Sequence, residues 1–214
     1  MNNEFSQLSP TLLADTLSHG QIMSIGIRPI WQPIPRIAGP AYTVYCNGND
    51  NSMVHAAIYK AKPGDVIVVE TTNNNFAVAG GNVCAVAKER GIAGFVIDGV
   101  IRDLLEIRCS AFPVFSRGVY PKPGVKKGEG ELEMPIWCGG VAVNMGDIVV
   151  ADEEGIVVVP KSRQNEIFQE AMFSEKIELD QSLDAWRQKH FKAIERLLSQ
   201  KKSLLEDKPL VPSI

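Results

Sequence analysis

The stretch that decides the fold is "DVIVVETTNNNFAVAGGNVCAVAKERGIAGFVID", residues 65–98. It begins and ends with short apolar runs, 65–70 and 94–98, whose length and β-branched content are typical of buried strands. Between them, residues 82–90 favour a helix that stops at Gly91. Strand, helix and strand in this order form a βαβ unit. The two strands should therefore be parallel and end at the same edge of a sheet.

Shorter elements surround this unit. Ser9 and Pro10 are suited to cap and open an N-terminal helix. Further helices are expected at 53–61 and 104–109, and further strands at 41–46, 112–115, 136–138, 147–151 and 155–159. The Pro-rich stretch 28–40 is expected to be an extended loop, and 118–133 a loop or edge. These elements predict one α/β domain with mixed sheets.

The C-terminal part has a different composition. Residues 161–202 contain no Gly or Pro. Apolar or aromatic positions recur there at helical spacing: Leu179, Leu183, Trp186, His190, Ile194 and Leu197. We predict a long helix or a helix pair. The predicted domains are thus a core of residues 1–160 and a helical extension of residues 161–214 that packs on the core or on a neighbouring subunit.

Composition excludes several classes of protein. The 214 residues carry a formal charge of −3, which gives no footprint for general nucleic-acid binding. No run of about 20 apolar residues predicts a membrane span, and the N-terminus lacks a signal-peptide pattern. The cysteines stand far apart, without zinc-site spacing: Cys46, Cys84, Cys109 and Cys138. We predict a cytoplasmic protein with free, buried thiols.

Two glycines precede the helix of the βαβ unit. Gly80-Gly81 allows a ligand to approach the backbone closely. The N–H groups of Gly81, Asn82 and Val83 would lie at the positive end of the helix dipole. A Gly-Gly pair before a helix can equally be an ordinary turn. The functional interpretation predicts a carboxylate or phosphate site formed by residues 80–83.

The second strand of the unit continues into "IDGVIRDLLE", residues 97–106. Arg102 and Asp103 leave this strand at the same sheet edge as the glycine loop, where α/β proteins favour ligand binding. Arg102 could pair with an anion or a developing oxyanion. Asp103 is a hard oxygen ligand for Mg²⁺ or Mn²⁺, and Glu106, one helical turn later, could hydrogen-bond a water on the metal. The alternative is a solvated ion pair or a helix cap.

Other polar residues are expected to be structural. Lys126-Lys127 should lie at the surface, which leaves no lysine in the site and argues against Schiff-base chemistry. The histidines show no pairing pattern with a Cys, Ser or acid, although His55, close to Asp50, could approach the site. Asp98 is expected to support the turn or to lie behind the site.

With these residues in place, the sequence resembles the family of the 4-hydroxy-4-methyl-2-oxoglutarate / 4-carboxy-4-hydroxy-2-oxoadipate aldolases and the regulator of ribonuclease activity A. The aldolase motif of that family is Gly, 20 residues, Arg-Asp, two residues, then an acid. Gly81, Arg102-Asp103 and Glu106 match it completely. Family-like stretches include "IAGPAYTV", "KPGDVIVVE", "GIAGFVIDGVIRD" and "GDIVVADEEGIVVVP", and the resemblance covers about residues 8–180.

The resemblance implies a swivelling α/β/β sandwich of the phosphohistidine-domain type. It also implies homotrimers, or hexamers of trimers, with active sites between subunits. The family's aldolases are class II enzymes that use Mg²⁺ or Mn²⁺, release pyruvate from 2-oxo acids and decarboxylate oxaloacetate.

The resemblance also implies roles for individual residues. Asp103 looks like the metal ligand and Arg102 like the residue that holds the keto or enolate oxygen. The amides of residues 80–83 look like the carboxylate-binding loop. Glu106 looks like the acid that the ribonuclease regulator lacks. Glu178 is the best match to an acid that the family places on the C-terminal helix of a neighbouring subunit.

Two other functions stay open. The first is a protein that inhibits a ribonuclease by contact, which Glu106 argues against. The second is a related metal-enolate enzyme that acts on another oxo or sugar-derived acid. The chain departs from the family beyond about residue 180, where Trp186 and Phe191 lie, and in the loop 71–79, and these departures motivate the second alternative.

Overall fold

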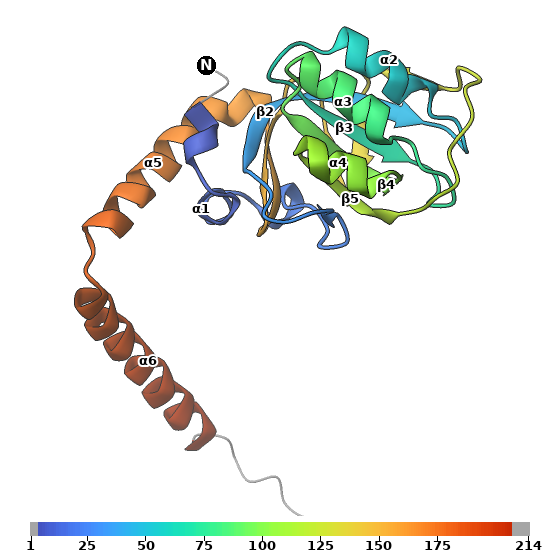
Figure 1. The fold of residues 1–214 in the computed structure, drawn as a ribbon. Coiled ribbons are helices and arrows are strands. Elements are labelled where there is room, and N and C mark those ends of the chain that lie inside the picture. The colour runs from blue at the N-terminus through green and yellow to red at the C-terminus, as the bar shows by residue number, and fades with distance from the viewer. Residues whose placement is uncertain (1–3, 207–214) are drawn as a thin grey trace, which may run out of the picture. The chain divides into compact units, whose positions relative to one another are not determined.

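The computed structural model describes residues 4–206. The chain divides into two compact units after Met172, here called the core unit and the C-terminal unit. Every strand of the described residues lies in the core unit, which is built around one large mixed sheet (Figure 1).

Four parallel strands form the centre of this sheet. They are β2 (Ile37–Cys46), β3 (Val66–Thr71), β4 (Gly94–Ile101) and β5 (Val114–Val119). Helix α3 (Gly81–Glu89) connects β3 to β4, so the predicted βαβ unit is confirmed. It ends before Gly91, whose φ of +79° suits a residue without a side chain. The parallel strands end at one edge, where the loops that follow β2, β3 and β4 meet.

Antiparallel strands complete the sheet. They are β1 (Arg28–Pro29), β6 (Gly130–Leu132), β9 (Ile148–Asp152) and β10 (Gly155–Val159). Strand β2 belongs to both parts, because residues 37–40 pair with β9 and residues 41–46 pair with β3. A separate hairpin consists of β7 (Ile136–Cys138) and β8 (Val141–Val143).

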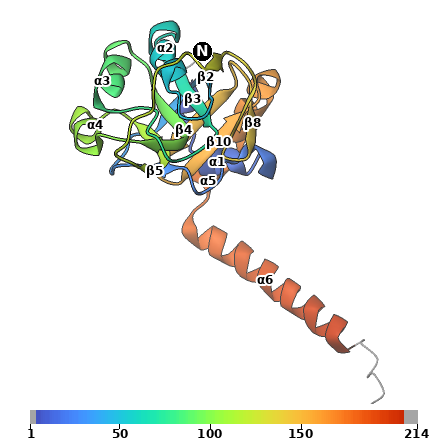
Figure 2. The same cartoon turned by 90° about the vertical axis from the view of Figure 1, so that its right-hand side faces the viewer.

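Helices cover one face of the parallel strands and β structure covers the other. The helices are α2 (Ser52–Lys60), α3 and α4 (Leu104–Ser110). Figure 2 shows these three helices on the side of the sheet opposite to β8 and β10. The hairpin strand β7 packs on β3. The predicted α/β/β sandwich is therefore confirmed.

A second apolar cluster closes the outer face of β9 and β10. Helix α1 (Pro10–Ala14) contributes Leu12 and Leu13, and Ser9 Oγ accepts a hydrogen bond from the Leu12 N–H at 3.1 Å, so the predicted cap is confirmed. The start of helix α5 (Gln164–Asp180) contributes Ile167 and Ala171 to the same cluster. The core unit thus includes the first turns of α5, and the predicted domain boundary after residue 160 stays a prediction.

The sequence placed several strand ends wrongly. Strand β2 begins at residue 37 rather than 41, because Pro40, which reads as a loop residue, lies where β2 passes from β9 to β3. Strand β4 runs to residue 101, past a register shift between Ile97 and Val100. Strand β5 extends to residue 119, and β8 was missed. Three cysteines are buried as expected, but Cys109 is exposed on the outer face of α4.

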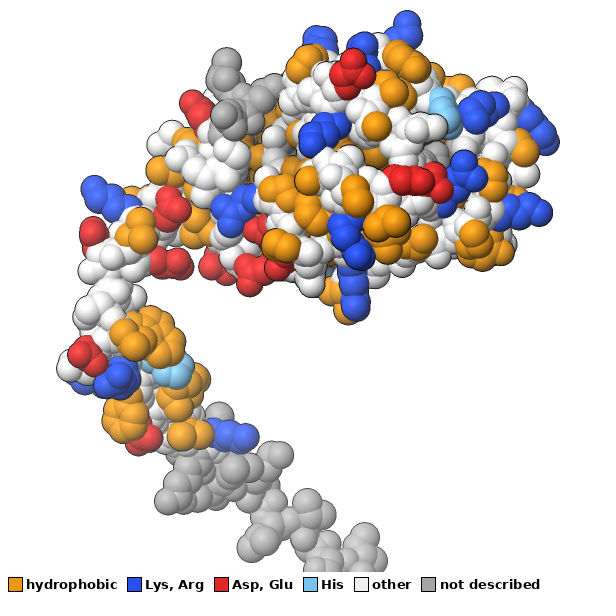
Figure 3. Space-filling model, viewed as in Figure 1, with side chains coloured by type: hydrophobic (Ala, Val, Ile, Leu, Met, Phe, Trp, Pro, Cys, Tyr) orange, Lys and Arg blue, Asp and Glu red, His pale blue; other side chains and the backbone are white. Residues whose placement is uncertain are grey.

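The C-terminal unit contains the end of α5 and helix α6 (Leu183–Glu206), so the predicted helix pair is confirmed. Ser182 caps α6 by accepting a hydrogen bond from the Ala185 N–H. Large apolar side chains of α6 are exposed and gather on this helix in Figure 3: Leu183, Trp186, Phe191, Ile194, Leu197 and Leu198. Within residues 4–206, no helix is both long and apolar enough to cross a bilayer.

Candidate active site

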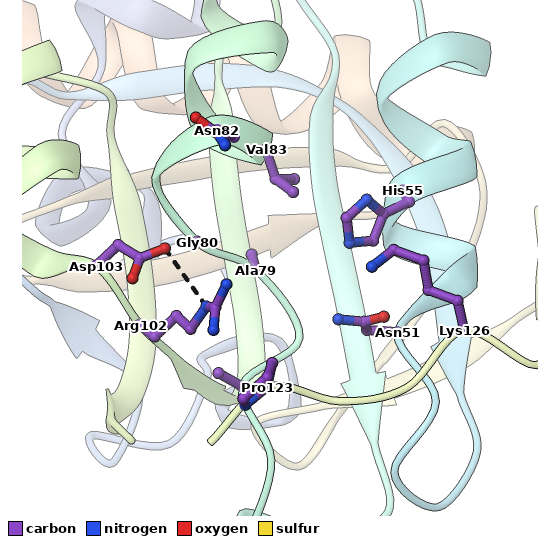
Figure 4. A pocket seen from close by; sticks show the side chains of 11 residues that line it. Asn51, His55, Ala79, Gly80, Asn82, Val83, Arg102, Asp103, Pro123 and Lys126 are labelled. Atoms are coloured by element: carbon purple, nitrogen blue, oxygen red, sulfur yellow. Dashed lines mark ion pairs between the residues drawn. The ribbon is translucent and has the colours of Figure 1, made fainter. Parts of the chain in front are cut away.

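A pocket of about 230 Å³ lies where the loops after β2, β3 and β4 meet. Its lining residues are Asn51, His55, Ala77, Ala79, Gly80, Asn82, Val83, Arg102, Asp103, Pro123 and Lys126. Figure 4 shows Arg102 and Asp103 on one side of the pocket and His55, Asn51 and Lys126 on the other. The structure thus brings the predicted glycine loop and the predicted Arg-Asp pair to one cavity.

The two glycines allow α3 to begin against the turn after β4. A Cβ at Gly80 would come within 2.4 Å of Asp103 Oδ2, and one at Gly81 within 2.5 Å of Glu106 Oε2. The Gly81 N–H donates a hydrogen bond to Asp103 Oδ2 at 3.0 Å. This amide, expected to be free for a ligand, is therefore bound to Asp103. The close packing explains why a Gly-Gly pair and an Arg-Asp pair occur together in this sequence.

Asp103 adopts an unusual backbone conformation. Its φ of 61° and ψ of 44° are left-handed, a conformation that Asp and Asn tolerate better than most residues. Arg102 Nε lies 3.4 Å from Asp103 Oδ2, and the Arg102 N–H donates to the Ala79 carbonyl at 3.1 Å. Among residues 4–206, no group hydrogen-bonds Asp103 Oδ1. The strained turn therefore presents one carboxylate oxygen that is open to a ligand.

The packing at Gly80 gives a testable prediction. Gly80→Ala should destabilise the protein by about 1–3 kcal/mol, because the new methyl group must displace the Asp103 carboxylate. Urea unfolding measures this loss. Gly118→Ala is the matched control, since a Cβ at Gly118 has no atom within 4 Å. Equal stability of the two variants would contradict the close packing.

The opposite wall of the pocket was largely missed by the sequence analysis. His55, on α2, is half-buried and lines the pocket, as the sequence had left open. Asn51 occupies the N-cap position of α2 without a side-chain capping hydrogen bond and is buried, with its Oδ1 unpaired within the described part of the chain. Lys126 is exposed as expected but also lines the pocket, so the expectation that no lysine belongs to the site is wrong.

The buried Asp50 holds the loop that carries Lys126. Its carboxylate accepts hydrogen bonds from the N–H groups of Ser52, at 2.6 Å, and Lys127. Burial would raise the pKa of Asp50, but a hydrogen bond from the Ser52 side chain, these two backbone bonds and one from the Glu129 backbone hold that pKa at about 2. The Val125 N–H also donates to the Asn49 carbonyl at 2.8 Å. The backbone on both sides of Lys126 is thus held by hydrogen bonds to Asp50 and Asn49.

Electrostatics keep His55 uncharged. Burial and the nearby charge of Lys126 lower the pKa of His55 from its usual 6.5. At pH 7 the imidazole is therefore neutral and can donate one N–H hydrogen bond. Apart from Asp103, the ionisable groups that line the pocket are cationic or neutral.

The remaining predicted site residues lie outside this lining. Glu106 contacts Gly81 beside the pocket, and its role stays a prediction. Glu178 lies in the C-terminal unit, where it lines a hollow with Gln181, Leu183 and Trp186, and its role also stays a prediction. Asp98 pairs with Arg117 and accepts a hydrogen bond from the Gly139 N–H at 2.7 Å. It ties the hairpin turn between β7 and β8 to β4.

The residues present fit a hard divalent cation in only one way. Among residues 4–206, no group of three or more His, Cys, Asp or Glu could enclose a metal ion. Asp103 offers a single open oxygen, which suits Mg²⁺ or Mn²⁺ because these cations often take one or two protein carboxylates and complete their shell with other oxygens. A dedicated protein cage, as in structural zinc sites, does not fit.

Comparison with known proteins gives the family. The RraA-like model, described as Aldolase/RraA, matches residues 11–158. The chain belongs to the RraA-like family. It is 38% identical to the "Putative 4-hydroxy-4-methyl-2-oxoglutarate aldolase" of Halalkalibacterium halodurans over 169 residues, which cover 78% of this chain and 80% of the relative. The corresponding protein of Burkholderia multivorans is 33% identical over 69% of this chain and 87% of its own length.

Solved structures agree with this RraA-like assignment. The RNA-processing inhibitor RraA from Thermus thermophilis is 30% identical, with a TM-score of 0.64 over 70% of this chain and 91% of its own. RraAS2 of Streptomyces coelicolor, described as an unusual member of the RNase ES inhibitor RraA protein family, is 28% identical, with a TM-score of 0.72 over 82% and 93%. The resemblance seen in the sequence is therefore confirmed at the level of family and fold.

Proposed function

We propose that this RraA-like protein is a divalent-metal-dependent aldolase. It would cleave 4-hydroxy-4-methyl-2-oxoglutarate and similar 2-oxo acids to pyruvate, and it would also decarboxylate oxaloacetate. The observation that carries the proposal is the contact of the Gly81 N–H and Arg102 with the Asp103 carboxylate at one pocket. The names of the aldolase relatives support the same reaction class.

Each polar group of the pocket would have a separate role in the reaction. Arg102 would hold the keto oxygen and stabilise the negative charge that develops there as the C–C bond breaks. The amides of Asn82 and Val83, at the positive end of α3, would bind the adjacent carboxylate. Retro-aldol cleavage also needs a base for the 4-hydroxyl, and we propose that Glu106 or Glu178 positions the water that takes this proton. Decarboxylation of oxaloacetate needs no such base.

Asp103 would hold the cation, Mg²⁺ or Mn²⁺. When bound, the cation supplies Lewis-acid polarisation of the substrate's keto oxygen. We also propose that the protein works in the cytoplasm as a homotrimer or hexamer, with Glu178 entering the site of a neighbouring subunit. The half-open site at Asp103 is consistent with a contribution from outside the core unit.

The test of the proposed function is direct. Purified protein with Mg²⁺ is expected to release pyruvate from 4-hydroxy-4-methyl-2-oxoglutarate and from oxaloacetate, and EDTA should abolish both activities. A coupled lactate dehydrogenase assay measures the pyruvate. Absence of metal-dependent pyruvate from both substrates would rule out this function.

A regulatory function is the second candidate. The descriptions of two structural relatives favour it: one is called an RNA-processing inhibitor and the other a member of the RNase ES inhibitor RraA protein family. The retained Glu106 argues against it, because the regulator lacks this acid in the family pattern. A pull-down with the host's RNase E-type ribonuclease, followed by a cleavage assay, distinguishes a regulator from an enzyme. A third candidate, metal-enolate chemistry on another oxo or sugar-derived acid, is tested with a panel of such acids.

A further inference from the structure

Helix α6 exposes an apolar face along its length (Figure 3). Its six large apolar side chains are each 39–68% exposed: Leu183, Trp186, Phe191, Ile194, Leu197 and Leu198. At 3.6 residues per turn, these side chains fall within an arc of about 140°. So wide an apolar stripe is unfavourable in water and marks a contact surface. The family match ends at residue 158, and the proposed aldolase chemistry does not use this helix face. Its role therefore has to be explained separately.

The opposite face of α6 is basic. Three exposed side chains lie there: Lys189, Lys192 and Arg196. Residues 183–201 contain five basic and two acidic residues, a net charge of +3, whereas the whole chain carries −3. The two acids, Asp184 and Glu195, lie at one edge of the apolar arc. The helix that exposes the apolar stripe is thus also positively charged, and its partner must offer apolar contact and negative charge together.

A dry contact with a second copy, or with a groove of another protein, fits this face poorly. Arg187 and Lys201 lie inside the apolar arc, and Arg187 pairs with Asp184 at 3.0 Å. A dry contact would have to take this exposed ion pair and the Lys201 ammonium group out of water, which is unfavourable. At a lipid surface, long basic side chains can reach the head groups while the apolar side chains beside them enter the lipid. An anionic lipid surface therefore fits α6 best.

We propose that α6 lies flat on the surface of an anionic membrane and attaches this RraA-like protein to it. The apolar face enters the boundary between head groups and acyl chains, and the basic side chains lie among anionic head groups. Trp186 and Phe191 stand at the two edges of the arc, and aromatic side chains favour this boundary. Binding of this kind needs no helix that crosses the bilayer. The inference goes beyond the proposed aldolase function and does not depend on it.

Sedimentation of the full-length protein with lipid vesicles tests the proposal. Phosphatidylcholine vesicles that contain about 30% phosphatidylglycerol should carry the wild type into the pellet. Vesicles of phosphatidylcholine alone should bind the protein about 10- to 100-fold more weakly, because the attraction of the basic residues is then lost. Salt at about 0.5 M should release the protein from the anionic vesicles, because it screens that attraction. Equal binding to both kinds of vesicle would overturn the proposal.

Two substitutions that add the same charge separate the two faces of α6. Leu197→Asp places a carboxylate inside the apolar arc and should weaken binding to the anionic vesicles by about 10- to 100-fold. Ser199→Asp, on the polar face, changes the net charge equally and should weaken binding by about fivefold or less. Circular dichroism checks that both variants remain helical. Equal losses in the two variants would mean that the apolar face does not contact the lipid.

Trp186 reports whether the apolar face itself enters the lipid. Trp186→Phe keeps an apolar ring, so its binding should stay within about twofold of the wild type. The difference between the emission spectra of the two proteins isolates Trp186 from Trp31 and Trp137, and it should shift to shorter wavelength when anionic vesicles are added. Bound protein without this shift would mean that another surface binds the vesicles, and the proposal would fail.

Light scattering distinguishes the other occupants of the face. Wild-type protein that stays in the supernatant with both kinds of vesicle would overturn the proposal. In that case, a lower molar mass for Leu197→Asp than for the wild type would assign the face to a second copy of the chain. Equal masses would assign it to a different protein.

Discussion

Asp103→Asn is expected to reduce Mg²⁺-dependent pyruvate release by about 1,000-fold or more. Lewis-acid stabilisation by a bound metal lowers the activation barrier of such a reaction by several kcal/mol, and this variant would lose it. The substitution changes only the charge and one ligand atom. Asparagine tolerates the left-handed backbone at this position, and its amide oxygen can still accept the Gly81 N–H. The fold should therefore survive. Titration with Mn²⁺ followed by electron paramagnetic resonance measures the loss of metal binding independently of activity.

Comparison of Asp103→Ala with Asp103→Asn separates the effect of the left-handed backbone on stability from the effect of the lost metal ligand on activity. Alanine adopts a positive φ less readily, so this variant should lose about 1 kcal/mol of stability in addition to activity. Asp184→Asn is the control, since this exposed acid lies on α6. If Asp103→Asn bound Mn²⁺ as tightly as the wild type and kept full activity, Asp103 would not be the ligand. If it lost activity but bound Mn²⁺ normally, Asp103 would act as a general base instead.

Periodicity and strand order were enough to predict half of this site. The apolar runs 65–70 and 94–98 required two parallel strands, and parallel strands end at one edge. That rule alone brought Gly80 and Arg102 to the same place. The sequence could not predict how closely the Gly80-Gly81 loop packs against Asp103. The Gly81 N–H binds Asp103 because residue 103 adopts a left-handed conformation, and a turn of this kind has no distinctive sequence signal when the residue is not glycine.

The other half of the site was missed because the same rule was not applied to β2. This strand is parallel to β3, so it ends at the same edge of the sheet. The segment that follows Cys46 therefore starts at the pocket and brings Asn51 and His55 there. A signal was therefore present. Lys126 had none: it lies in a loop of Gly, Pro and Lys whose path depends on hydrogen bonds to Asp50 and Asn49. Such long-range bonds cannot be inferred from local composition.

Arg102→Gln should lower kcat for both retro-aldol cleavage and decarboxylation by about 100- to 1,000-fold, the usual effect of removing a donor to a developing oxyanion. The guanidinium is well placed for this role because Arg102 lines the pocket and its side chain is 42% exposed, although its Nε also lies 3.4 Å from Asp103 Oδ2. Arg102→Lys keeps the charge but loses the planar fork, so its activity should fall between those of the wild type and Arg102→Gln. Steady-state kinetics on both substrates measure these losses.

Substitutions of Arg102 and of Asp103 should differ in their effect on metal affinity. Arg102 Nε lies 3.4 Å from Asp103 Oδ2, so removing the guanidinium takes a competing cation away from the carboxylate. Arg102→Gln should therefore bind Mn²⁺ at least as tightly as the wild type while losing kcat, whereas Asp103→Asn should lose both. Arg108→Gln, at an exposed position on α4, should change neither. Weaker Mn²⁺ binding in Arg102→Gln would mean that the arginine orders the turn, and unchanged kcat would mean that the oxyanion is stabilised by other groups.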